Sequence, residues 1–279
     1  MSNWGIDPCS HLSTRIPHIP RIMRNKGMVV GATLMEHWLN NGANDQPERG
    51  VHDINTVRMN WVLSFGRAGA VFRRDVRNKV WMTERAKELL VRKLIRREGR
   101  LPSKVGEKYA QKIGNVGEGV TLHANNVLRF HEDWYIQTTQ VKENPLKSPL
   151  DDLYAALGNF SFHYLMKGRV ERLEDQGGKP RYRVTFEKVG VYVKDSYDFI
   201  DDLVGDGNPL NRVFSQPLGF WGCSPNSVAK HPFPLEARRN YVQNRDFREW
   251  RKRYGKGHGG DFLVFSNIKV FDVSDSFEF

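Results

Sequence analysis

An α+β fold is predicted by a change in the spacing of apolar residues along the chain. In the first part these residues recur every three to four positions, as on amphipathic helices, and later they alternate with polar residues, as in strands. We therefore expect a flexible leader over residues 1–17, a helical region over residues 18–115 and a strand-rich region over residues 116–279. The helical N-terminal half is expected to pack on a C-terminal bent antiparallel sheet or partial β-barrel.

The helical region contains three segments with helical spacing. Residues 19–41 are broken at Gly27, so a short helix followed by a longer one is expected. Residues 56–78 carry one apolar stripe and are expected to form another helix, weakened by two glycines. The next helix is expected from Thr83, as its N-cap, to Glu98. Its predicted inner stripe consists of Ala86, Leu90 and Leu94.

The strand-rich region is predicted from a period of two. Short strands are expected over residues 120–123, 127–131 and 134–141, followed by a short helix over residues 149–157. Two longer strands then form a hairpin around Asp175–Gly178, and Gly190 marks a bulge or bend in the second of them. A basic helix around residues 247–254 and a strand over residues 262–270 complete the order.

Composition limits the class of protein. With 279 residues, 39% apolar residues and 11% aromatic residues, the chain has the composition of a globular protein. It has no apolar run of the roughly 18 residues needed to cross a bilayer, and no signal peptide is recognised. We expect synthesis in the bacterial cytoplasm and export without a signal peptide. The two cysteines, Cys9 and Cys223, offer no disulfide framework.

The positive charge is concentrated in one segment. The chain has a net charge of +11, and residues 67–112 contain fifteen Lys or Arg residues against five Asp or Glu residues. Residues 238–256 contain eight basic residues interleaved with aromatic ones. Such surfaces bind nucleic acid, anionic membranes or acidic proteins, although the spacing of Phe247, Trp250 and Tyr254 favours packing in a core.

An acidic cluster follows the second long strand. Five aspartates fall within Asp195–Asp206, in a chain that is otherwise basic. Neighbouring carboxylates can share a divalent cation or divide into an acid and a base, and they also cap turns after strands. Asp195 and Tyr197 are expected to point to one side of the strand and Asp198 to the other, unless the chain bends at Phe199.

Other catalytic signatures are weaker. His123, His131 and His163 are possible bases or metal ligands, but their spacing fixes no geometry. The chain lacks the His-x-x-x-His helix of zinc hydrolases, the Gly-x-Ser-x-Gly elbow and the Gly-rich phosphate loop ending in Lys-Ser/Thr.

Two resemblances add a functional context. The runs LDDLYAALGNFSF, VGVYVKDSYDF, LGFWG and FREWR…GGDFLVFS resemble an uncharacterised bacterial family, often encoded near type VI secretion and toxin genes, over residues 17–279. This resemblance implies an effector used against competing bacteria, with a secretion apparatus and a cognate immunity protein as partners.

The second resemblance is local. Asp195, Tyr197 and Asp198 are similar to the Asp-x-Tyr-Asp motif of colicin M-type bacteriocins, which cut the lipid-linked peptidoglycan precursor next to its pyrophosphate, with Mg²⁺, in the periplasm. Those enzymes continue with a His-Arg pair, where this chain has Val204 and Gly205. The missing pair could be supplied from elsewhere, and the candidate substrate-binding residues are Arg212, His231 and His258.

Three hypotheses remain open at this point. The first is an antibacterial effector of the cell envelope, a Mg²⁺-assisted hydrolase of an anionic, pyrophosphate-linked lipid. In it Asp195 and Asp198 hold the metal or activate water, and Tyr197 orients the substrate. The second is a non-enzymatic adaptor or membrane-perturbing toxin whose basic helices bind an acidic surface. The third is a nucleic-acid-binding protein or nuclease.

Overall fold

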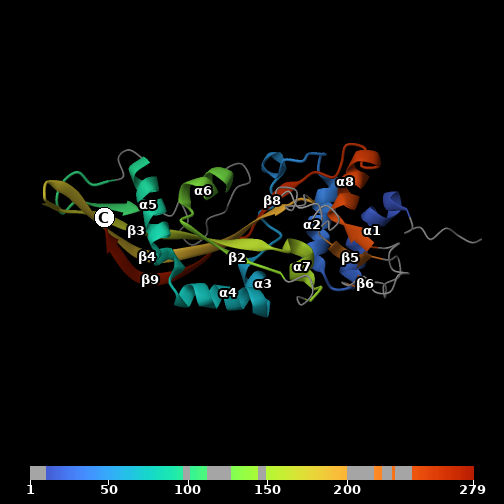
Figure 1. The fold of residues 1–279 in the computed structure, drawn as a ribbon, viewed down its shortest axis with the longest axis horizontal. Coiled ribbons are helices and arrows are strands. Elements are labelled where there is room, and N and C mark those ends of the chain that lie inside the picture. Colours follow the sequence, from blue (N-terminus) through green and yellow to red (C-terminus); the bar gives the residue numbers. More distant parts are fainter. Residues whose placement is uncertain are drawn as a thin grey trace, which may run out of the picture. The chain divides into compact units, whose positions relative to one another are not determined.

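The computed structural model describes residues 11–96, 101–111, 127–143, 149–199, 217–221, 228–229 and 241–279. The predicted α+β class is confirmed, because the helices lie mostly in the N-terminal half and the strands mostly in the C-terminal half (Figure 1). The main antiparallel sheet curls into a half-barrel. Among the described residues, no helix is both long and apolar enough to span a bilayer.

The chain forms two compact units whose segments interleave. One unit contains residues 1–56, 142–159 and 195–264, and the other contains residues 57–141, 160–194 and 265–279. This division differs from the three consecutive regions expected from composition. Both units therefore depend on contacts between segments that are distant in the sequence.

The first unit is mainly helical. Its helices are α1 (Leu12–Asn25), α2 (Val29–Asn40), the 3₁₀ turn η1 (Pro47–Arg49), α7 (Asp152–Leu157) and α8 (Asn244–Arg253). A small sheet has the strand order β6-β5-β7, formed by β5 (Pro217–Trp221), β6 (Val228–Ala229) and β7 (Tyr241–Gln243). Helix α1 packs on α2 and α8, and α2 packs on α7.

The predicted leader is wrong for residues 12–17, which belong to helix α1. This helix contains Pro17 and Pro20, which in a sequence indicate a break. Burial of Ile16, Ile19 and Met23 on one face stabilises the helix despite the prolines. The predicted break at Gly27 is confirmed, since this residue has φ +76° between α1 and α2.

The second unit is built on the main sheet. Its helices are α3 (Met59–Ser64), α4 (Gly66–Arg77), the 3₁₀ turn η2 (Val80–Met82), α5 (Glu84–Arg96) and α6 (Val127–Trp134). The strands of the sheet are β1 (Lys108–Gln111), β2 (Gln137–Val141), β3 (Phe160–Gln176), β4 (Lys179–Tyr197), β8 (Phe262–Phe265) and β9 (Lys269–Glu278). Residues 195–197 of β4 and 262–264 of β8 are counted with the first unit. The strand order is β1-β3-β4-β8, with β2 paired to β3 and β9 paired to β4.

The long β3–β4 hairpin has the predicted turn. Gly177 and Gly178 have φ values of +59° and +72°, which suits a two-residue hairpin loop. The irregularities in pairing lie at Lys167/Gly168 and Leu173/Gln176, not at Gly190. Gly190 instead permits close packing, because a Cβ added there would lie 2.5 Å from Leu165 Cδ1.

One strand prediction and one helix prediction are corrected by the structure. Residues 127–131 belong to helix α6 rather than to a strand, because Val127, Phe130, His131 and Trp134 repeat at helical spacing, which a five-residue window cannot distinguish from a strand. The single helix predicted over residues 56–78 is two helices, separated at the extended residue Phe65. The predicted inner stripe of α5 is confirmed, since Ala86, Leu90 and Leu94 are buried.

Candidate functional site at the end of strand β4

The acidic motif lies where strand β4 ends. The strand ends at Tyr197, and along the motif burial separates the aromatic residues from the acidic ones. Tyr197 and Phe199 are buried, whereas Asp195 and Asp198 are half-buried. The aromatic side chains therefore fix the backbone, and the carboxylates stay within reach of solvent.

Tyr197 is a core residue. Its hydroxyl group lies 3.8 Å from the Met35 sulfur, and its ring stacks on Phe262 at 5.2 Å between centroids. Burial, together with the nearby charge of Asp195, raises the pKa of the Tyr197 phenol well above its usual value, so this group stays protonated. Because the hydroxyl is held in the core, its expected role in orienting a substrate is not part of the site proposed below.

Phe199 anchors the chain just after the strand, as the sequence suggested. Its ring is parallel to that of Phe247 at 3.8 Å and meets the ring of Trp38 edge-on at 4.8 Å. Arg248 of α8 donates a hydrogen bond to the Phe199 carbonyl oxygen. The direction of the chain at Asp198 is therefore set by an aromatic cluster of this unit.

Asp195 and Asp198 line the same small cavity. It has a volume of about 70 Å³, and its walls come from the end of β4, from α7 with the residue after it, and from the start of α8. The residues that line it are Tyr154–Gly158, Asp195–Phe199 and Asn244. Two carboxylates and one carboxamide, all from one unit, therefore border a single space.

Helix α7 is held in place by its two aspartates. Asp151 caps α7 by accepting a hydrogen bond from the Tyr154 amide, at 3.0 Å. Asp152 accepts hydrogen bonds from the amides of Val30 and Gly31, at 3.1 and 2.8 Å, in the first turn of α2. These bonds fix the wall of the cavity that α7 provides.

Helix α8 brings Asn244 to the cavity. At the start of the helix Asp246 accepts a 2.8 Å hydrogen bond from the Gln243 amide, and Asn244 is 4% exposed. Phe247 and Trp250 are buried, which confirms that these aromatic residues pack in the core. The exposed residue Tyr254 lies just after the helix.

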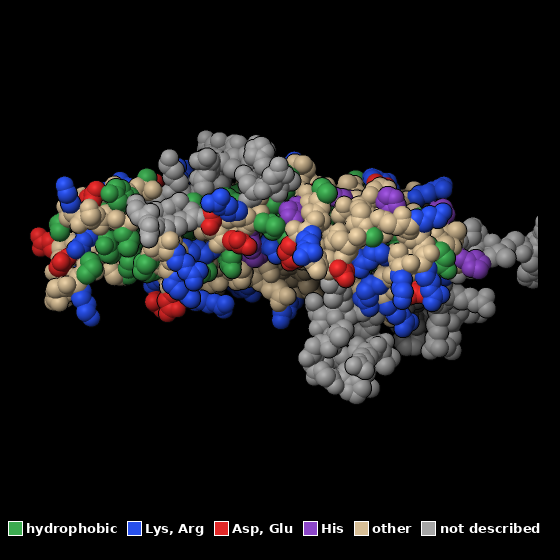
Figure 2. Space-filling model, turned by 90° about the horizontal axis from the view of Figure 1, so that it is seen from above, with side chains coloured by type: hydrophobic (Ala, Val, Ile, Leu, Met, Phe, Trp, Pro, Cys, Tyr) green, Lys and Arg blue, Asp and Glu red, His purple; other side chains and the backbone are tan. Residues whose placement is uncertain are grey.

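The two carboxylates at the cavity suit a magnesium ion. Mg²⁺ is bound through one or two carboxylates together with water and substrate phosphates, so the oxygen donors of Asp195 and Asp198 fit its chemistry. Within the described ranges, no three His, Cys, Asp or Glu side chains are grouped to hold a metal. On the face seen in Figure 2, Lys and Arg side chains are more widespread than Asp and Glu side chains.

The other predicted site residues are not brought to this cavity by the described structure. His258 is exposed, and its Nδ1 atom lies 3.3 Å from the carbonyl oxygen of Asn40; it is not among the lining residues. Arg212 and His231 lie outside the described residues, as do Asp201, Asp202 and Asp206. Cys9 and Cys223 also lie outside them.

Sequence reasoning did not assign Asn244 or the α7 residues to the site. The Asp-Asp pair at 151–152 and the Gln-x-x-Asp capping box were the available signals, and both mark helix starts rather than a cavity. Only the three-dimensional arrangement places the last residues of α7 and the first residue of α8 beside Asp195 and Asp198.

Two of the predicted histidines meet in the second unit. His131 of α6 and His163 of β3 have ring centroids 4.8 Å apart, and His131 Nδ1 lies 2.7 Å from the Tyr192 hydroxyl oxygen. Burial, with the charges of Lys194 and Lys93, lowers the pKa of His131 to about 3. Burial also lowers the pKa of His163 well below its usual value. Both rings are therefore neutral at pH 7; His163 is buried in this unit and His131 is half-buried.

From the lowered pKa values of His131 and His163 we expect acid to destabilise the folded protein. An imidazole whose pKa is lower in the folded state binds its proton first in the unfolded state. The stabilisation from His131 should therefore be complete above about pH 6.5, and the free energy of unfolding should fall by roughly 1 kcal/mol per pH unit as the pH drops toward 3. His163 should add to this loss in the same direction. Urea unfolding between pH 7 and pH 4 measures this dependence.

The matched variants for this measurement are His163→Phe and His258→Phe. The first removes a buried imidazole and should flatten the pH dependence of unfolding, whereas the second removes an exposed one and should leave it nearly unchanged. Equal slopes for wild type and His163→Phe would contradict the assignment of His163 as a buried neutral group.

Comparison with known proteins gives one match. No curated protein and no solved structure matches the chain. A family model described as a family of unknown function (DUF6402) matches residues 14–279. Since this match covers nearly all of the 279 residues, the chain belongs to the DUF6402 family.

Proposed function

We propose that the protein is an antibacterial effector that hydrolyses a pyrophosphate-linked lipid precursor of the cell envelope, with Asp195 and Asp198 at its active site. The observation that supports this proposal most directly is the shared cavity, because the two acidic residues of the motif border one space together with Asn244. An aromatic cluster that fixes the backbone on both sides of Asp198 provides the rigidity that catalysis requires.

The chemistry assigns different tasks to the parts of the site. A water oxygen forms a bond to phosphorus, and the bond from phosphorus to the lipid oxygen breaks. The proton lost by the water is accepted by a carboxylate, for which Asp198 is our candidate, and the leaving lipid oxygen takes up a proton from solvent to give the alcohol. Bound Mg²⁺ supplies positive charge against the phosphate oxygens. Asp195 helps to hold the ion, and the Asn244 carboxamide orients a phosphate oxygen through a hydrogen bond.

The size of the cavity restricts which part of the substrate enters it. A cavity of about 70 Å³ is well below the roughly 300–1,000 Å³ of sites that bury a whole drug-sized ligand, so it suits a small group such as a phosphate. The lipid and sugar parts of a precursor must therefore lie outside the cavity.

The compartment of action tests this function in cells. We expect a Gram-negative host to lyse when the protein is directed to the periplasm, to grow when it stays in the cytoplasm, and to survive periplasmic Asp198→Ala. The matched control is Asp272→Ala in the second unit, whose side chain is 85% exposed and should be dispensable.

Three other outcomes would contradict the proposal. Periplasmic killing that survives Asp198→Ala would favour a membrane-perturbing toxin. Killing only from the cytoplasm would favour a nuclease, for which steep salt dependence of nucleic-acid binding is the next measurement. Growth in both compartments would favour an adaptor without toxicity.

A further inference from the structure

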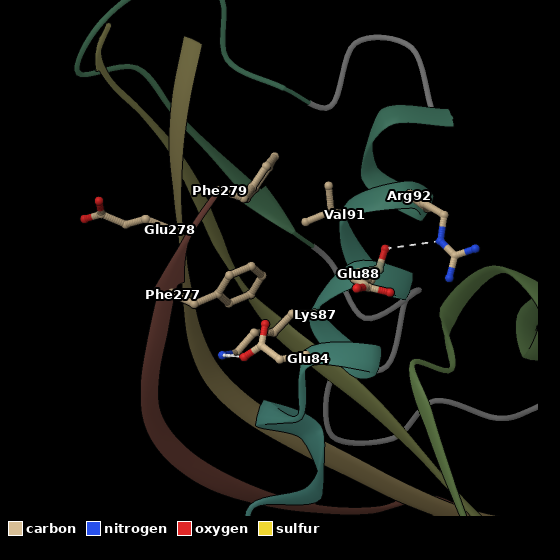
Figure 3. A pocket seen from close by; sticks show the side chains of 8 residues that line it. All are labelled: Glu84, Lys87, Glu88, Val91, Arg92, Phe277, Glu278 and Phe279. Carbon is tan, nitrogen blue, oxygen red and sulfur yellow. Dashed lines mark hydrogen bonds and ion pairs between the residues drawn. The ribbon is translucent and has the colours of Figure 1, made fainter. Parts of the chain in front are cut away.

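A second and larger cavity lies in the second unit, between helix α5 and the end of strand β9. It has a volume of about 580 Å³, within the range of ligand-binding clefts. Phe277 and Phe279 point from β9 toward α5, where Val91 lies (Figure 3). The full lining consists of Glu84, Lys87, Glu88, Val91, Arg92, Phe277, Glu278 and Phe279. We call this space the α5–β9 groove.

Helix α5 contributes a face that its own unit leaves partly uncovered. The buried stripe of α5 consists of Ala86, Leu90 and Leu94. The residues that line the groove lie three or four positions apart on the neighbouring face of the helix, at positions 84, 87, 88, 91 and 92. Val91 is half-exposed in the middle of this face. The wall that α5 provides is therefore apolar at its centre, at Val91, and charged at its margins.

Three of the five charged lining residues form ion pairs. Lys87 pairs with Glu84 at 2.7 Å, and Glu278 pairs with Arg183, also at 2.7 Å, and with Arg181. The Arg92 Nε atom donates to the Glu88 carbonyl oxygen. The groove therefore best complements an occupant that is uncharged where it faces Phe277 and Phe279.

Within the part of the chain that the structure describes, one edge of strand β9, beside this groove, has no paired strand. Phe279 and Tyr182 exchange two backbone hydrogen bonds, of 3.0 and 2.9 Å, and hydrogen bonding alternates along an antiparallel pair. The backbone groups of Phe277 and Phe279 therefore point to β4, and those of Ser276 and Glu278 point outward. Among the described strands only β4 pairs with β9, and no described backbone group bonds Ser276 or Glu278 outside that ladder.

We propose that the outer edge of β9 binds an extended segment of a partner polypeptide with apolar side chains at alternate positions. A strand added there would satisfy the outward N–H and C=O groups of Ser276 and Glu278. Its alternate side chains would lie on the same face as Phe277 and Phe279 and fill the α5–β9 groove. A small apolar molecule could fill the groove, but it would leave the strand edge unpaired. This interaction is independent of the hydrolase proposed above.

The test uses a synthetic peptide of about eight residues in which Val or Phe alternates with Thr or Lys. Fluorescence anisotropy with the full chain should detect saturable binding. The same peptide N-methylated at alternate residues keeps its side chains but cannot pair with an edge, and it should not bind. Equal binding of both peptides would overturn the proposal.

Two pairs of protein variants locate the binding surface. Ser276→Pro removes one outward N–H at an edge position, where proline is tolerated, and should weaken binding about tenfold, whereas Ser276→Ala keeps the N–H and should bind like wild type. Val91→Glu places a charge in the groove and should abolish binding, whereas Val105→Glu, at an exposed loop position, should not affect it.

The folding of each variant is checked by its thermal midpoint. Undiminished binding by folded Ser276→Pro or Val91→Glu would overturn the assignment to this edge. A wild-type dimer in sedimentation that Ser276→Pro dissociates would overturn the choice of occupant, because the edge would then pair with a second copy of the chain.

Discussion

Asp198→Asn is expected to lower the hydrolysis of a lipid-linked pyrophosphate by about 10²–10⁴-fold, the contribution usual for a general base. Asn has nearly the same shape as Asp but carries no charge and accepts no proton at neutral pH. The half-buried position of Asp198 on the cavity wall means that this change should leave the core unaltered. The measurement is the initial rate of lipid release by purified protein with Mg²⁺, at equal thermal midpoints.

Three further variants make this result specific. Asp195→Asn should also reduce the rate, because it lines the same cavity, and Asp272→Asn on the exposed face of β9 should not. Tyr197→Phe should keep most of the activity, since the hydroxyl that it removes is buried and has the Met35 sulfur as its hydrogen-bond partner. A full rate in Asp198→Asn, or a loss in Tyr197→Phe as large as that in Asp198→Asn, would contradict the site as proposed.

Local patterns predicted the parts of the fold that depend on local forces. The Asp-Gln-Gly-Gly turn predicted the β3–β4 hairpin because only glycine adopts its positive φ values without strain. The spacing of Phe247 and Trp250 predicted their burial in α8, and the apolar stripe of α5 predicted its inner face. In each case the residues that predicted the structure lie within one turn or on one face of one helix.

The features that could not be predicted from the sequence depend on contacts between distant segments. Helix α1 contains two prolines and is stabilised by packing on α2 and α8, which no local pattern reveals. Asp195 and Asp198 were recognised as a pair, but Asn244 reaches the same cavity only through the packing of α8. The interleaving of the two units has the same origin, because the chain passes between them several times.

Trp38→Ala is expected to be the most destabilising single substitution among those considered, at about 3–5 kcal/mol. The Trp38 ring is fully buried and contacts the rings of Phe199, Phe247 and Trp250 at 4.8, 5.6 and 5.9 Å between centroids. Its removal leaves a cavity among large aromatic side chains that cannot close by small movements. Equilibrium unfolding in urea, followed by tryptophan fluorescence and by circular dichroism, measures the loss.

The indole nitrogen adds a polar contribution to this effect. Trp38 Nε1 donates a 2.8 Å hydrogen bond to Oδ1 of Asp261, a carboxylate that is 0% exposed and that also pairs with Arg251 at 3.0 Å. Burial raises the Asp261 pKa, and the hydrogen bonds from Trp38 and Arg251 oppose that rise. Loss of Trp38 therefore removes one donor that stabilises the buried carboxylate, which lowers the free energy of unfolding. Trp38→Phe keeps a ring but loses this donor, and it should cost about 1–3 kcal/mol.

The comparison of these variants also separates stability from catalysis. Trp61→Ala is the matched control, because Trp61 is half-exposed and contacts the ring of Phe65 in the second unit; it should cost about 1 kcal/mol. Since Phe199 rests on Trp38, Trp38→Ala should impair hydrolysis at temperatures where the protein is still folded, and Trp61→Ala should not. A Trp38→Ala protein with an unchanged unfolding midpoint would mean that the aromatic cluster does not hold the chain at Asp198.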